Sequence, residues 1–106
     1  MTVYTRLTEM TVCALPEENV NHGHYAITVQ WRGGETYAVK RHSLVLGADG
    51  KWDYEPMPSS RDDAWIATHR FSYDEACRLA VEAAPHVTVN GHTVADVLAA
   101  AERRRP

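Results

Sequence analysis

The stretch Tyr25-Ala-Ile-Thr-Val-Gln-Trp31, which Gly33-Gly34 separates from Glu35-Thr-Tyr-Ala-Val-Lys-Arg41, decides the fold of this chain. In the first segment every second residue is large and apolar, which is the period of a half-buried strand. The same period resumes after the glycines with Tyr37 and Val39. Two such segments around a glycine pair predict an antiparallel hairpin.

The length of the connecting loop sets which faces of the two strands coincide. A two-residue loop would put Tyr37 and Val39 on the face opposite Ile27 and Val29, whereas a three-residue loop puts them together. We therefore expect a three-residue loop over residues 32–34, which pairs Trp31 with Glu35. That loop also suits a type I turn that closes on a left-handed glycine.

Turn and cap signals place the other elements. Residues 44–46 and 51–55 flank an Asp-Gly turn and predict a second hairpin. Residues 2–8 are predicted to form a short strand, because they are rich in threonine and branched or aromatic side chains. Farther on, a Ser-x-x-Glu box over residues 72–75 begins a helix that Pro85 stops, and Thr93 begins a last helix.

Residues 60–71 allow two interpretations. Ser60 as N-cap, with two aspartates in the first turn, predicts a helix that carries Trp65 and His69 on one face. The alternative is a strand, since Trp65, Ala67, His69 and Phe71 also alternate. We favour the helix.

These elements predict one α+β domain over residues 1–106, of a length that can hold its own core. We expect a less regular segment over 1–23, an antiparallel β-meander of about four strands over 24–55, and a mainly helical half over 60–104. Two or three helices are expected to pack on one face of the sheet.

Charge and composition narrow the class of protein. The net charge is −3, and the only basic cluster is Arg103-Arg104-Arg105, which argues against a general nucleic-acid binder. The sequence has no apolar run of about 18 residues and its first ten residues do not look like a secretory signal. Two distant cysteines, Cys13 and Cys77, are expected to be reduced thiols in a cytoplasmic protein, with a disulfide as the alternative.

No catalytic or cofactor motif is present in the sequence, so we expect a protein that is not an enzyme and that uses no cofactor or metal. His22 and His24 would project on the same side of a strand, yet no third ligand stands at a zinc-site spacing. A small metal-dependent enzyme that uses these histidines and a nearby carboxylate therefore remains an alternative.

The segment after residue 51 has the composition of a protein interface. Tryptophan, tyrosine, methionine and arginine are enriched at such surfaces, and a loop braced by two prolines loses little entropy on binding. We predict that the chain binds another protein or itself, as a homodimer, through this segment. The predicted protein-binding residues are Trp52, Tyr54, Met57, Arg61 and Trp65.

The alternative partner is single-stranded nucleic acid, since aromatic side chains on a sheet can stack bases. Its expected residues are Trp31, Tyr37, Lys40, Arg41 and Trp52.

The motif Trp52-Asp-Tyr-Glu-Pro-x-Pro-Ser-Ser-Arg-Asp-Asp-x-Trp65, with His69-Arg-Phe71 and Asp74-Glu-Ala-x-x-Leu-Ala80, resembles small proteins of actinobacteria and their phages to which no function is attached. The resemblance covers roughly residues 25–100. It implies a cytoplasmic accessory protein, encoded by a phage or another mobile element, and it carries over no functional residue.

Overall fold

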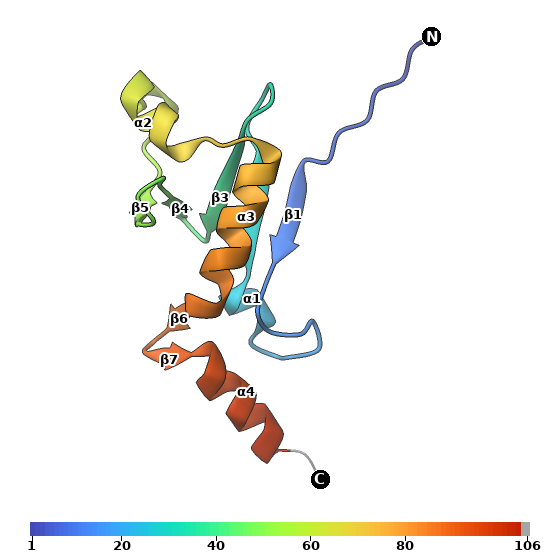
Figure 1. Ribbon diagram of the computed structural model, residues 1–106, viewed down its shortest axis with the longest axis vertical. Coiled ribbons are helices and arrows are strands. Elements are labelled where there is room, and N and C mark those ends of the chain that lie inside the picture. The colour runs from blue at the N-terminus through green and yellow to red at the C-terminus, as the bar shows by residue number, and fades with distance from the viewer. Residues whose placement is uncertain (105–106) are drawn as a thin grey trace.

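A five-stranded antiparallel sheet forms the body of the protein, as seen in the computed structural model, which describes residues 1–104 (Figure 1). The strands follow one another across the sheet in chain order, so the chain is a meander of the predicted α+β class. The strands are β1 (Glu9–Val12), β2 (Ile27–Trp31), β3 (Tyr37–Arg41), β4 (Leu44–Leu46) and β5 (Trp52–Tyr54).

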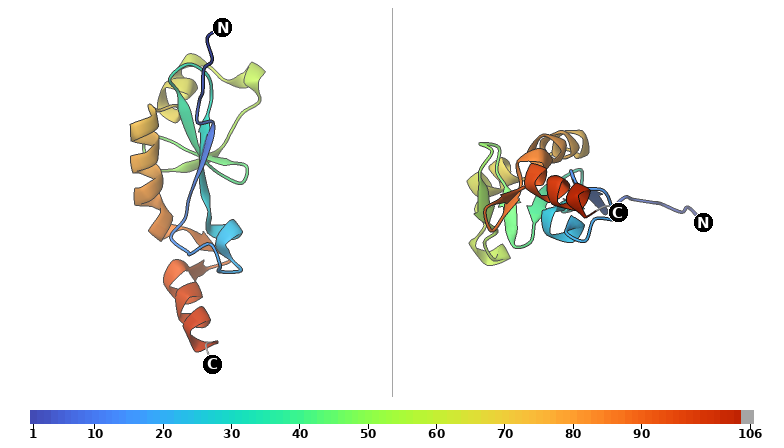
Figure 2. Two further views of the ribbon diagram at one scale, coloured as in Figure 1. Left: turned by 90° about the vertical axis from the view of Figure 1, so that its right-hand side faces the viewer. Right: turned by 90° about the horizontal axis from the view of Figure 1, so that it is seen from below.

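Helices follow and flank the sheet. They are α1 (His22–Tyr25), α2 (Asp63–His69), α3 (Tyr73–Ala83) and α4 (Val94–Arg103), with 3-10 turns η1 (Pro58–Ser60) and η2 (Ala84–His86) and a small ladder of β6 (Thr88–Val89) and β7 (His92–Thr93). Helix α3 lies along one face of the sheet (Figure 2), whereas α4 continues past the end of the sheet (Figure 1). No helix within residues 1–104 is long and apolar enough to cross a membrane.

The core lies between α3 and the central strands. Ile27, Val29 and Val39 are fully buried on the sheet, and Ala76 and Ala80 are fully buried on α3. Alanine on this helix face lets the helix axis approach the sheet closely, because no long side chain separates the two backbones.

The first hairpin confirms the predicted faces but not the predicted register. Trp31 pairs with Tyr37 instead of Glu35, and Val29 pairs with Val39. The tip still holds three residues, but they run from Gly33 to Glu35, one position later than predicted, and both glycines adopt positive φ, 99° and 54°. Each residue of β2 therefore pairs with a residue of β3 that is two positions later than predicted. Because side chains alternate with a period of two, every side chain keeps its predicted face.

The predicted strand over residues 2–8 is wrong, because β1 begins at Glu9. The carbonyl of Thr8 accepts a hydrogen bond from the Trp31 N–H at 2.8 Å, and β2 ends at that residue. Strand propensity cannot form a strand without a neighbouring backbone, so the chain before Arg6 runs away from the sheet (Figure 1).

The helix predicted over residues 60–71 is confirmed, but it begins later than expected. Ser60 ends the 3-10 turn η1 and Arg61 is extended, with φ −87° and ψ 113°. Asp62 is the N-cap of α2, since its Oδ1 accepts from the Trp65 N–H at 2.7 Å. The predicted N-cap, Ser60, lies two residues too early, because Pro58 has already started a separate turn that ends at Ser60.

The two other helix starts follow their local signals. The Ser72 hydroxyl accepts from the Glu75 N–H, while the Glu75 carboxylate pairs with Arg78 and does not reach back to close the box. Thr93 and Asp96 close a full capping box, with hydrogen bonds of 3.1 and 3.0 Å.

Candidate functional site

One carboxylate, that of Glu55, binds three arginines from separate segments of the chain. Arg70 donates to its Oε1 at 2.7 Å and Arg32 to its Oε2 at 2.9 Å, while an Arg61 nitrogen lies 3.6 Å from Oε2. The Glu55 side chain is only 15% exposed. These four residues, which we call the Glu55 cluster, join the end of β2, the loop after β5 and the end of α2.

The charges in the Glu55 cluster are unbalanced. Burial alone would raise the pKa of Glu55, but hydrogen bonds from Arg70 and Arg32 outweigh it and hold the pKa below its ordinary value. Burial lowers the pKa of Arg70, and repulsion from Arg32 and Arg61 adds to this, while Glu55 opposes it. One negative charge therefore faces three positive ones, which makes Glu55 the common counter-ion of the cluster.

Arg61 also closes the loop that follows Glu55. Its Nε donates to the Pro56 carbonyl at 2.8 Å, and Pro58 begins the 3-10 turn inside the loop. We call residues 55–61 the Met57 loop, because Met57 lies at its outer side and is 73% exposed. The loop is thus fixed at both ends while an apolar side chain projects from it.

Helix α2 supports this loop through a stack of rings. The Trp65 ring lies parallel to the His69 ring, with centroids 4.2 Å apart, and the Arg70 guanidinium lies 5.2 Å from the Trp65 centroid. His69 is buried, and its Nδ1 lies 2.8 Å from the Trp65 carbonyl. Its Nε2 lies 3.4 Å from an oxygen of Asp53. Trp65 thus contacts both the buried His69 ring and the guanidinium of Arg70, which links the helix to the Glu55 cluster.

The predicted protein-binding residues have different roles in the structure. Trp52 packs against the core and Tyr54 is 77% exposed, although register places both on the face of Leu44 and Leu46. Arg61 and Trp65 belong to the Glu55 cluster and its supporting stack. Only Tyr54 and Met57 of the predicted set present most of their apolar surface to solvent.

The residues expected to form a nucleic-acid platform do not share an open face. Tyr37 is buried and meets the ring of Tyr73 edge-on at 5.2 Å. Trp31 lies under the Arg6 guanidinium at 4.8 Å. Arg41 donates to two backbone carbonyls, and strand alternation puts Lys40 on the opposite face from it. Trp52, the fifth residue of this set, packs against the core.

The two neighbouring histidines occupy a helix and not the strand on which their shared side was predicted. His22 and His24 lie in α1, where residues two apart point in nearly opposite directions. Within residues 1–104 no three histidine, cysteine or acidic side chains gather as a metal ion would need. Cys13 and Cys77 are free thiols, both half-buried.

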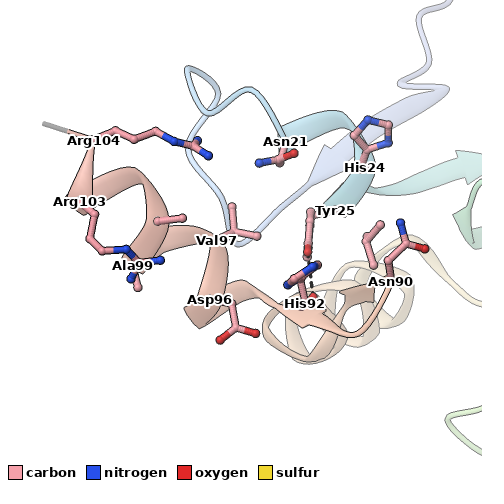
Figure 3. Close-up of a pocket in the computed structure, with 12 residues that line it drawn as sticks. Asn21, His24, Tyr25, Asn90, His92, Asp96, Val97, Ala99, Arg103 and Arg104 are labelled. Atoms are coloured by element: carbon pink, nitrogen blue, oxygen red, sulfur yellow. Dashed lines mark hydrogen bonds between the residues drawn. The ribbon is translucent and has the colours of Figure 1, made fainter.

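A groove of about 770 Å³ lies between α1, the β6–β7 turn and α4 (Figure 3). Tyr25 crosses its floor and donates its hydroxyl hydrogen to the His92 carbonyl at 2.8 Å. Helix α4 buries Val94 and Val97 in its first half, while Leu98 is 42% exposed. The groove forms because α4 continues past the end of the sheet and leaves space between itself and α1 (Figure 1).

Sequence reasoning missed most of the Glu55 cluster. The sequence places Arg32 in a turn, Arg70 near the end of a helix and Glu55 at the end of a strand. The three positions are 23 and 15 residues apart, with Glu55 between Arg32 and Arg70. No local spacing signals such a meeting. The pair of Trp65 and His69, four residues apart, was foreseen from helical periodicity.

Comparison with known proteins adds no relative. A scan against protein-family models finds no match, and searches of the curated proteins and of the solved structures find none either.

Proposed function

We propose that this chain is a non-enzymatic cytoplasmic accessory protein that acts by binding another protein through the Met57 loop. The observation that carries the proposal is the pairing of a fixed backbone with an exposed apolar tip. Met57 is 73% exposed, while Arg61 holds the loop closed through Pro56 and Glu55.

Rigidity of this kind favours binding. A side chain on a fixed loop loses little backbone entropy when it enters a partner, so more of its burial energy appears as affinity. Methionine also adapts its shape to irregular apolar pockets. The ion pairs of the Glu55 cluster hold the loop and leave the surface of Met57 exposed.

The partner that fits this loop is a protein with an apolar pocket. Met57 would fill the pocket, and the exposed ring of Tyr54 would lie at its rim, where its hydroxyl stays in water. The free thiols of Cys13 and Cys77 fit a reducing compartment such as the cytoplasm.

The test uses a photo-crosslinking amino acid at position 57 in cells of the organism that encodes the chain. The control places the same amino acid at Val81, which is 61% exposed on α3. We expect a discrete crosslinked protein from position 57 only. Met57→Ser should then weaken its binding to the purified chain by at least about tenfold, while Val81→Ser leaves it unchanged.

Two results would overturn the proposal. One is the same crosslinked proteins from positions 57 and 81, which would mean nonspecific contact. The other is a partner whose affinity does not change with Met57→Ser, Arg61→Ala or Trp65→Ala.

A further inference from the structure

The protein exposes more surface than a compact chain of its mass. Its accessible surface is 7245 Å², whereas a compact monomer of this size exposes about 5,900 Å². Its radius of gyration is 15.9 Å, against about 13 Å for a compact domain. The surplus of more than about 1,000 Å² is comparable to what one partner buries in a standard interface.

Part of the surplus lies in the segment before β1. Residues 1–8, which we call the arm, run past the sheet (Figure 1), and Val3, Tyr4 and Leu7 are 79%, 86% and 52% exposed. The end of the arm is held to the first hairpin. Arg6 lies over Trp31 and pairs with Glu35 at 3.4 Å, and the carbonyls of Leu7 and Thr8 accept hydrogen bonds from Tyr37 and Trp31. The arm is rich in strand-forming residues but lacks the neighbouring backbone that would make it part of a sheet.

The sheet also has an open edge beside the arm. Strand β1 pairs with β2 on one side, and within residues 1–104 no strand pairs with its other side. Since Thr8 bonds inward to Trp31, strand alternation directs the N–H and C=O groups of Glu9 and Thr11 outward, to the open edge. The arm lacks a strand to pair with, and the outer edge of β1 lacks one too. Each could therefore supply the backbone hydrogen bonds that the other needs.

We infer that a second copy of this chain occupies that edge, with β1 and the arm of each copy paired antiparallel across a two-fold axis at Leu7. This pairing is the one that matches the whole length of residues 2–12 with itself. It places Leu7 beside Leu7 of the second copy and Val3 beside Thr11 on one face. Tyr4 then lies beside Met10 on the other face.

This register also extends the core. Met10 is half-buried, packs against the core and accepts a hydrogen bond from Tyr73 through its sulfur. A Tyr4 ring from the second copy would cover Met10 on the open side of β1. The Leu7 carbonyl already accepts from the Tyr37 hydroxyl at 3.2 Å, and its second lone pair leaves it free to bond across the axis.

The dimer can be tested on the full chain by sedimentation equilibrium. We expect a dimer with a dissociation constant in the micromolar range or below. Leu7→Asp, which sets two like charges against each other at the axis, should raise that constant by at least about tenfold. Val20→Asp is the matched control, because Val20 is 83% exposed in the loop between β1 and α1, outside the paired residues 2–12, and it should leave the constant unchanged.

A crosslink tests the register. A self-paired residue lies about 5.5 Å from its copy between Cα atoms, within the range of a disulfide. Leu7→Cys should therefore form a covalent dimer under mild oxidation, and the wild-type chain, which keeps Cys13 and Cys77, should not.

A wild-type chain that is monomeric at about 100 μM would overturn the inference, because an interface of this size should associate well below that concentration. A dimer that Leu7→Asp weakens no more than Val20→Asp would overturn it too. The inference is independent of the Met57 loop, since Met57→Ser should leave the dimer intact.

Discussion

Replacing Glu55 by glutamine removes the negative charge that three arginines share. Its hydrogen bonds to Arg70 and Arg32 measure 2.7 and 2.9 Å, and each charge-assisted bond contributes about 1.5 kcal/mol. The Arg61 contact is longer, at 3.6 Å, and adds less. Water can solvate part of the freed guanidinium groups, so we expect Glu55→Gln to lower the free energy of unfolding by about 2–3 kcal/mol.

The assay is thermal or urea unfolding at pH 7, followed by circular dichroism. For a domain of this size the loss corresponds to a fall in Tm of roughly 10–15 °C. The matched control is Glu82→Gln, which removes an exposed ion pair with Arg78 on α3 and should shift Tm far less. If both variants unfold at the same temperature, the arginines are solvated independently and Glu55 does not hold the loop.

The difference in unfolding free energy between wild type and Glu55→Gln should also depend on pH, which gives a second measurement. The folded-state pKa of Glu55 lies below its ordinary value of 4.5, so the stabilising effect is complete above about pH 5. It is lost as the pH falls through the lower folded-state pKa, because protonation then neutralises the carboxylate. The difference in stability between wild type and Glu55→Gln should therefore shrink in that acid range and remain constant between pH 6 and about 8.

Three further substitutions test the packing and the caps. Ala80→Leu inserts a large side chain where α3 meets the sheet and should lower the free energy of unfolding, measured in urea, by about 1–3 kcal/mol. Val81→Leu on the exposed side of the helix should be nearly neutral. Equal losses would mean that α3 is not tightly packed against the sheet. Gly47→Ala places a Cβ 3.1 Å from Nε2 of His69 and should destabilise the protein by about 1–2 kcal/mol, with a shift of the His69 ring signals in NMR as the specific sign. Thr93→Ala removes the N-cap of α4 and should cost about 1 kcal/mol, read as faster amide exchange in the first turn of α4 and unchanged exchange in β2.

The sheet edge and the Met57 loop give the protein two separate surfaces. β1 and its arm lie at one edge of the sheet, while the loop follows β5 at the other. If both proposals hold, a dimer joined at β1 presents two copies of the Met57 loop to partners. Two linked binding loops raise the effective concentration of the second contact, so a partner with two pockets would bind more tightly than one with a single pocket.

The sequence by itself determined what depends on near neighbours. Alternation from Ile27 to Trp31 set the faces of the central hairpin, whereas Tyr25, which the same pattern placed on the strand, lies in α1. Those faces survived a slip in register because both registers keep the parity of each residue. Ser72 and Thr93 marked the starts of two helices, since a cap involves only the next three residues. The α+β class follows from these local patterns.

Tertiary structure decided what depends on distant neighbours. The arm has the composition of a strand, yet β2 ends at Trp31 and leaves it without a partner, so strand propensity was not enough. Arg32 and Arg70 meet at Glu55 only because the hairpin tip and the end of α2 converge on the loop after β5. Burial then makes that carboxylate the shared counter-ion of three arginines. No spacing along the chain encodes such a meeting, because it arises from the packing of the whole fold.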